Sequence, residues 1–129
     1  MREILFKAKR KSNGEWIEGY YVVLPLVHYK RNEYLITDSK GDSYEIDPST
    51  LCQYTGLTDK NGKKIFENDI INKVDTNALG WHRERICTVS WNKGYWQIMT
   101  EYGDSYWIGE FDEEQLEVLG NVFDNPELL

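Results

Sequence analysis

The sequence has no apolar run of the about 18 residues that a membrane-spanning helix requires, and no apolar stretch of signal-peptide length near its start. We therefore expect a protein of the cytoplasm without a membrane partner. Cysteine is equally scarce, with two residues in a chain of 129. Two cysteines are too few for a disulfide framework, so Cys52 and Cys87 are expected to be reduced and largely buried.

Patterns that support catalysis or metal binding are also missing. A zinc site would need both histidines and both cysteines, and no pair among them has the close spacing of structural zinc ligands: His28, Cys52, His82 and Cys87. A Cys–His nucleophile pair has no recognisable local signature, and a calcium-like run at 59–62 has its glycine at the fourth position instead of the sixth. We therefore expect no enzyme, no cofactor, no metal and no small-molecule substrate. The sequence leaves open whether the acids between Glu110 and Glu117 hold a cation.

Positive charge is absent from the end of the chain. Residues 101–129 contain nine acidic side chains and no lysine or arginine, whereas the whole chain has a net charge of −7. The opposite end is basic, with the side chains Arg2, Lys7, Lys9, Arg10 and Lys11. This segregation indicates electrostatic contact between the two ends, either within one chain or between the subunits of a homo-oligomer.

Aromatic residues are plentiful, and apolar residues recur at every second position, which is the period of a β-strand. Asn13-Gly14 is a strong hairpin signal, because both residues tolerate a positive φ angle. Strands are predicted at residues 4–9, 16–24, 34–37, 44–46, 51–54, 65–71, 85–91, 95–101, 106–109 and 117–119. Segments 27–33 and 75–84 are predicted to be loops, the second of them mobile, and 112–116 to be one helical turn.

Many short strands at nearly regular spacing predict an all-β fold with little helix. Closing such strands into a small barrel removes exposed edges, so we expect a β-barrel subdomain at residues 59–129. The preceding residues, 1–58, are expected to form a subdomain of β-hairpins packed beside it.

Three stretches of sequence resemble one known family. They are the run 55–71 (TGLTDKNGKKIFENDII), the ending 118–129 (VLGNVFDNPELL), and the opening ILFKA at 4–8 with Trp16 and Gly19. Together they resemble the YopX family of phage and prophage proteins, with Glu67-Asn68-Asp69 where the family usually has Glu-Gly-Asp. The resemblance implies a single YopX-like domain over 1–129, an SH3-like barrel, a phage or prophage origin and expression in a bacterial host cell. It implies no activity and no catalytic residues.

The acidic end of the chain also carries the candidate partner-binding residues. An acidic surface with exposed aromatic rings suits a basic protein partner, from the host or the phage, or a second copy of the chain. The candidates are Trp81, Tyr95, Trp96, Tyr102, Tyr106, Trp107, Glu110, Asp112, Glu113 and Glu114. We do not expect nucleic acid to bind there, because the acids repel phosphates. Two alternatives remain: nucleic-acid binding by the basic first strand, and a cryptic enzyme.

Overall fold

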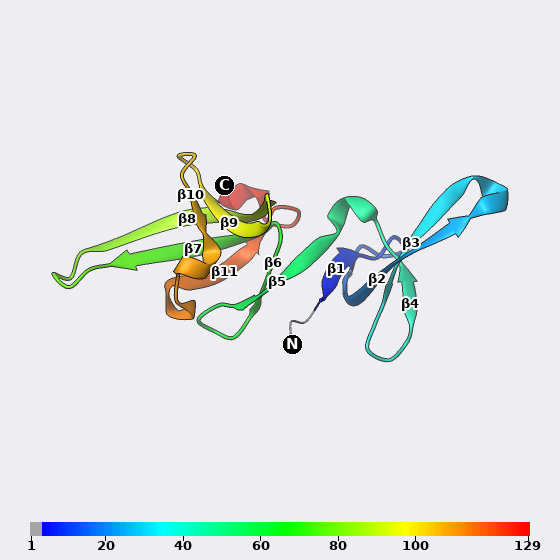
Figure 1. Ribbon diagram of the computed structural model, residues 1–129, viewed down its shortest axis with the longest axis horizontal. Coiled ribbons are helices and arrows are strands. Elements are labelled where there is room, and N and C mark those ends of the chain that lie inside the picture. Colours follow the sequence, from blue (N-terminus) through cyan, green and yellow to red (C-terminus); the bar gives the residue numbers. More distant parts are fainter. Residues whose placement is uncertain (1–3) are drawn as a thin grey trace. The chain divides into compact units, whose positions relative to one another are not determined.

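The structure, a computed structural model, describes residues 4–129 (Figure 1). Its ordered elements are strands joined by turns and short 3₁₀ helices, so the all-β prediction is confirmed. The chain forms two compact units, a first unit that ends at Tyr54 and a second unit, Thr55–Leu129. The units therefore divide inside a strand, four residues before the end of the predicted hairpin subdomain.

The first unit is an antiparallel sheet in the order β4-β3-β2-β1-β5. Its strands are β1 (Phe6–Lys9), β2 (Trp16–Leu26), β3 (Arg31–Thr37), β4 (Ser43–Glu45) and the beginning of β5 (Cys52–Thr58). The long β2–β3 hairpin closes through the 3₁₀ helix η1 (Val27–Tyr29), followed by Lys30 at a φ of 51°. The predicted loop at 27–33 is therefore too long, since β3 already begins at Arg31 and pairs there with Leu26.

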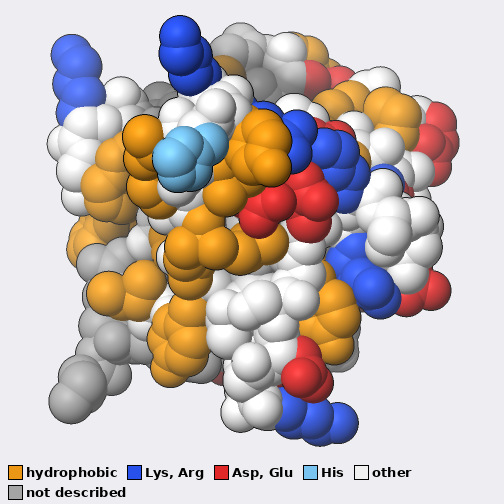
Figure 2. Space-filling model, turned by 90° about the vertical axis from the view of Figure 1, so that its right-hand side faces the viewer, with side chains coloured by type: hydrophobic (Ala, Val, Ile, Leu, Met, Phe, Trp, Pro, Cys, Tyr) orange, Lys and Arg blue, Asp and Glu red, His pale blue; other side chains and the backbone are white. Residues whose placement is uncertain are grey.

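The core of the first unit is small. Ala8, Ile36 and Ile46 are buried in it, and half-buried neighbours pack around them. Several apolar side chains of the β2–β3 hairpin remain exposed, among them Val27 and Tyr29. Figure 2, which views the molecule from the side of this hairpin, shows hydrophobic side chains gathered around a histidine. The first unit thus keeps much of its apolar surface in contact with water.

The second unit contains a five-stranded antiparallel sheet in the order β10-β9-β8-β7-β11. Its strands are β7 (Asp69–Thr76), β8 (His82–Asn92), β9 (Tyr95–Thr100), β10 (Ser105–Trp107) and β11 (Leu116–Asn121), while β6 (Lys64–Phe66) pairs with β5. Strands β10 and β11 end the order, and no pairing among residues 4–129 joins them. The barrel predicted at 59–129 is therefore an open sheet in the described chain, and an SH3-like closure is not observed.

A larger core stabilises the second unit. Eight side chains are buried in one cluster: Ile65, Ile71, Cys87, Val89, Trp96, Ile98, Ile108 and Leu116. They come from β6, from four strands of the sheet, and from the 3₁₀ helix η3 (Ile108–Glu110). Tyr106, Phe111 and Val118 pack against this cluster. Burying an aliphatic side chain contributes about 1.5–3 kcal/mol, so this core dominates the stability of the unit.

The predicted mobile loop at 75–84 is strand at both of its ends, and only its middle is a turn. Strands β7 and β8 remain paired as far as Thr76 and His82. The connecting turn is held by Asn77, whose Oδ1 accepts hydrogen bonds from the amides of Leu79 and Trp81 at 3.0 and 2.9 Å. Because the Asn77 side chain accepts hydrogen bonds from amides of its own turn, a short fixed turn stands where the polar sequence predicted a longer loop.

The run 55–71 has a structural role. Asp59 is fully buried, and its Oδ1 accepts hydrogen bonds from the amides of Asn61 and Lys63. Its Oδ2 accepts one from the amide of Val118 in β11, at 2.8 Å. Burial opposes ionisation of this carboxyl, but the three amide donors outweigh it and lower its pKa. Asp59 therefore ties the turn after β5 to the edge of the sheet.

Candidate functional site

Four of the ten candidate residues line one surface hollow of about 480 Å³ in the second unit. The hollow is lined by Tyr95, Ser105, Tyr106, Trp107 and Glu110, and we call it the edge hollow. Three aromatic residues and one glutamate therefore border the same hollow. Ser105 is the lining residue that the sequence did not suggest.

The hollow lies at the open edge of the sheet. Ser105 and Trp107 pair with Met99 and Gln97, whereas Tyr106 between them pairs with Ile98. Successive side chains of a strand point to opposite faces of its sheet. A hollow that touches all three residues of β10 must therefore run along the edge of this strand.

The ring of Trp107 lies across Gly109. A Cβ atom at Gly109 would approach this ring to 2.5 Å, closer than non-bonded carbon atoms tolerate. Glycine at this position thus allows Trp107 to take its place in the wall of the hollow. The sequence signal, a glycine two residues after a tryptophan, is too common to identify such a contact.

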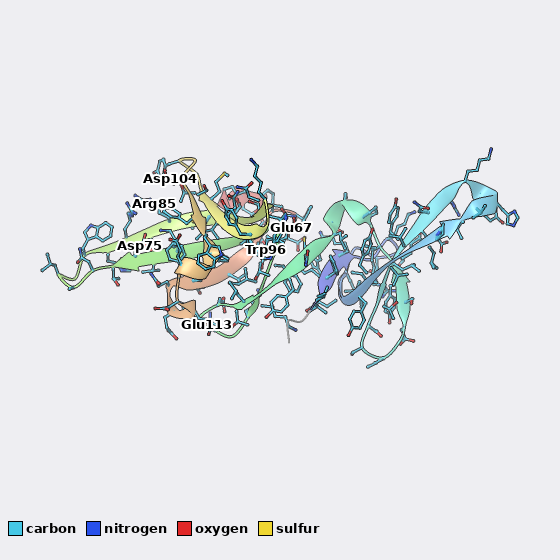
Figure 3. All side chains as sticks on the ribbon, viewed as in Figure 1. Glu67, Asp75, Arg85, Trp96, Asp104 and Glu113 are labelled. Atoms are coloured by element: carbon cyan, nitrogen blue, oxygen red, sulfur yellow. The ribbon has the colours of Figure 1, made fainter. Side chains whose placement is uncertain are left out.

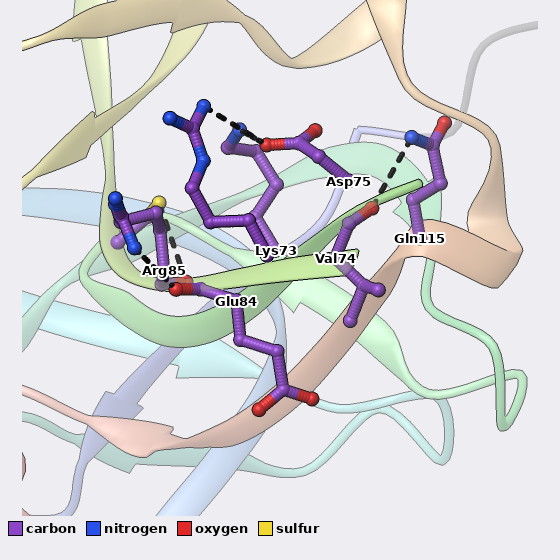
Figure 4. Close-up of polar contacts among 8 residues, drawn as sticks. Lys73, Val74, Asp75, Glu84, Arg85 and Gln115 are labelled. Carbon is purple, nitrogen blue, oxygen red and sulfur yellow. Dashed lines mark hydrogen bonds and ion pairs between the residues drawn. The ribbon is translucent and has the colours of Figure 1, made fainter. Parts of the chain in front are cut away.

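Tyr106 is held from behind by a buried lysine. The side chain of Lys73 is only 2% exposed, and its Nζ lies 4.6 Å from the ring centroid of Tyr106 and 5.0 Å from that of Phe111. Its charge is balanced by an ion pair with Asp75 (Figure 4). Arg83 also approaches Asp75, at 3.5 Å. An ammonium over an aromatic face is attracted by the ring quadrupole.

Lys73 was missed from the sequence, although a signal existed. It follows the core residue Ile71 by two positions, so strand alternation directs both to the same face. Composition alone does not predict its burial, because lysine is rarely buried without a partner. The partner, Asp75, follows by a further two positions and so shares that face.

Other candidate residues lie outside the hollow. Trp96, which was expected to be exposed to a partner, is buried in the core at 6% exposure and packs edge-on against Trp91 at 4.9 Å. Trp81 and Tyr102 are exposed in two hairpin turns, each beneath an arginine, Arg83 and Arg85 respectively. Neither of these two rings lines the edge hollow.

The acidic candidates follow β10 along the chain. Asp112, Glu113 and Glu114 are exposed at the 3₁₀ helix η4 (Glu113–Gln115), where Glu113 accepts a hydrogen bond from the Thr58 hydroxyl at 2.8 Å. Asp104 lies in the turn before β10, and Figure 3 labels it together with Glu113. Strand β10 is thus preceded and followed by carboxylates.

Both cysteines are free and buried, as predicted. Burial raises the pKa of Cys87 to about 11, so its thiol stays protonated at neutral pH. Among residues 4–129, no group of three or more His, Cys, Asp or Glu side chains is placed to hold a metal ion. The described chain also contains no helix that is long and apolar enough to cross a membrane.

The basic first strand contacts aromatic rings of its own unit. The Nζ atoms of Lys7 and Lys9 lie 4.7 and 5.5 Å from the ring centroid of Trp16. Arg10 lies over Tyr44, and Lys11 forms an ion pair with Glu45 at 3.3 Å. Arg2, the remaining member of this basic set, is outside the described residues.

The fold and the hollow define a small all-β protein with two antiparallel sheets and an acidic, aromatic hollow at one sheet edge. The family model described as YopX protein matches residues 5–129, so the chain belongs to the YopX family. The crystal structure of protein EF1440 from Enterococcus faecalis is similar over 100% of this chain and 99% of that chain, with a TM-score of 0.52 and 25% sequence identity. No curated protein matches the sequence.

Proposed function

We propose that this chain is a noncatalytic, phage-encoded interaction module that acts in the cytoplasm of a bacterial host. Its edge hollow binds a basic segment of a host or phage protein. The observation that carries this proposal is the meeting of Tyr95, Tyr106, Trp107 and Glu110 in one hollow. Aromatic faces attract a lysine or arginine side chain, and a carboxylate beside them completes its recognition.

The charge of the second unit supports a basic partner. From Thr55 onward the chain has seven lysine and arginine residues against fourteen aspartate and glutamate residues, so this unit accounts for the whole net charge of −7. Opposite charge on a partner raises the rate of encounter and fixes its orientation. A nucleic-acid backbone, by contrast, is repelled by the same field.

A peptide titration tests the proposal. The probe is a capped eight-residue peptide in which lysine alternates with threonine, and the control replaces every lysine by glutamate. We expect calorimetric binding of the lysine peptide alone, weaker at high salt because exposed charges are screened. Binding of neither peptide, or of both equally, contradicts the proposal.

A pair of tryptophan variants locates the binding. Trp107 and Trp81 have similar exposures, 53% and 47%, but Trp107 lines the hollow and Trp81 does not. Trp107→Ala should weaken binding of the lysine peptide about tenfold, whereas Trp81→Ala should change it less than about twofold. Equal losses in the two variants contradict binding at the hollow.

Two other functions compete with this proposal. Self-assembly through the basic first strand and the acidic end predicts an oligomer that dissociates as salt rises, which light scattering measures. Nucleic-acid binding by the first strand predicts that oligothymidine binds with an affinity that falls steeply with salt. Lys7 and Lys9 of the first strand lie beside the ring of Trp16. Cations next to an aromatic ring suit a single-stranded nucleic acid, so this observation supports testing nucleic-acid binding.

A further inference from the structure

We infer that the basic partner segment binds as an added β-strand along β10, with one lysine or arginine side chain in the edge hollow. This inference rests on the proposed function and specifies how the partner is held. It predicts main-chain hydrogen bonds between the partner and β10, in addition to the contacts of the inserted side chain. The support comes from the two edge strands of the sheet: the main chain of β11 is covered by another segment, whereas that of β10 is open.

The β11 edge is covered. The amide of Lys60 donates a hydrogen bond to the carbonyl oxygen of Leu116 at 2.9 Å. The amide of Val118 on the same strand donates to the carboxylate of Asp59 at 2.8 Å. The turn after β5 therefore satisfies main-chain groups of β11 that a further strand would need.

The β10 edge presents main-chain groups to a partner. Thr100 donates its amide hydrogen to the carbonyl of Asp104 at 2.8 Å, which makes these two residues a hydrogen-bonded pair. Bonded and non-bonded pairs alternate along antiparallel strands, so Tyr106 bonds to Ile98 across β9. The amides of Ser105 and Trp107 then point away from β9, toward the open edge.

The sequence of β10 does not guard this edge. Natural sheets protect exposed edge strands with lysine, proline, inward-pointing charge or a very short strand, and of these devices β10 has only its short length. Because the strand has three residues, an added strand gains only a few hydrogen bonds. Each contributes modestly, and affinity therefore depends on the hollow as well.

One extended segment can both pair its main chain with β10 and place a cationic side chain in the edge hollow. Side chains of an added strand alternate between faces, so one residue can direct its cationic side chain toward Trp107 and Glu110, and the residues two positions away share its face. The surrounding acids select lysine or arginine at these positions, because residues 101–129 contain no lysine or arginine and the charge of Lys73 behind Tyr106 is already paired with Asp75. The partner is therefore an extended segment with alternating basic residues.

Backbone methylation of the probe tests the strand geometry. Two versions of the lysine–threonine peptide are compared, one N-methylated at the lysine amides and the other at the threonine amides. In an added strand one set of amides faces β10 and the other faces solvent. One version should therefore bind about tenfold more weakly than the parent, and the other within about threefold.

Amide exchange in the protein gives a second readout. Binding of the parent peptide should slow hydrogen exchange at Ser105 and Trp107 by about tenfold or more, and leave the already bonded amide of Tyr106 unchanged. Equal binding of the two methylated peptides, or unchanged exchange at both edge amides, overturns strand addition while the proposed function stands. Failure of the parent peptide to bind overturns the proposed function itself.

Discussion

The two units of this chain differ in charge and in core size. Up to Tyr54 the sequence has eight basic and eight acidic side chains, whereas from Thr55 onward acids outnumber bases by fourteen to seven. The buried core cluster has three members in the first unit and eight in the second. The comparison teaches that whole-chain averages conceal a division: the second unit carries both the larger core and the acidic hollow.

Matched core truncations measure this difference and have the largest expected effect. Ile98→Ala should lower the free energy of unfolding by about 4 kcal/mol, because it leaves a cavity inside a packed cluster. Ile36→Ala should cost about 2 kcal/mol, because its half-buried neighbours can close around the gap. Urea unfolding followed by circular dichroism measures both losses. A larger loss from Ile36→Ala would contradict the conclusion that the second unit has the more stabilising core.

Matched lysine substitutions come next. Lys73→Met should cost about 3 kcal/mol, because it removes the partner of Asp75 from a buried ion pair. Lys7→Met should cost about 0.5 kcal/mol, since its contact with Trp16 lies at the surface of the first unit. Chemical denaturation of both variants gives the two values. Similar losses would show that the burial of Lys73 adds no stability.

Asp59 gives the second unit a dependence on pH. Its pKa is lowered in the folded state, so the unfolded chain takes up a proton first as the pH falls below about 4, and stability is lost there. Asp59→Asn should cost about 2 kcal/mol at pH 7, because one amide donor loses its acceptor. The difference from wild type should shrink by pH 3. A constant difference in urea midpoint would contradict the role of the ionised carboxylate.

The smallest effect on stability is expected in the wall of the hollow. Gly109→Ala places a methyl group against the ring of Trp107 and should displace it, weakening lysine-peptide binding about tenfold while changing the unfolding free energy by less than about 1 kcal/mol. In the Trp107→Ala background the same change should cost no further affinity. Additive losses would show that Gly109 acts through another contact.

Turn residues made much of the fold predictable. The strand predicted at 65–71 is divided by a turn at Asn68, which has a φ of 68° between β6 and β7. The ends of the strands were harder to predict, because pairing with a neighbouring strand outweighs the local conformational preference of a residue. Pro25 remains within β2, paired with Asn32, at a point where β1 no longer pairs with that strand.

Sheet closure and the hollow could not be predicted to the same extent. Alternating side chains are the same in an open sheet and in a barrel, so the sequence does not distinguish them. Tyr95 and Trp107 were named as candidates because they are aromatic, and both line the edge hollow. The contacts that place them depend on residues distant in the chain, such as Lys73 behind Tyr106.

Strand β5 has a consequence for gene recombination. It begins in the first unit, where Cys52 and Gln53 pair with β1, and continues into the second, where the hydroxyl of Thr55 donates a hydrogen bond to the carbonyl of Ile65. Domains that are exchanged between genes are commonly joined by exposed, flexible linkers. Here a crossover at the boundary would cut through a strand, so we expect the two units to be exchanged between genes only together.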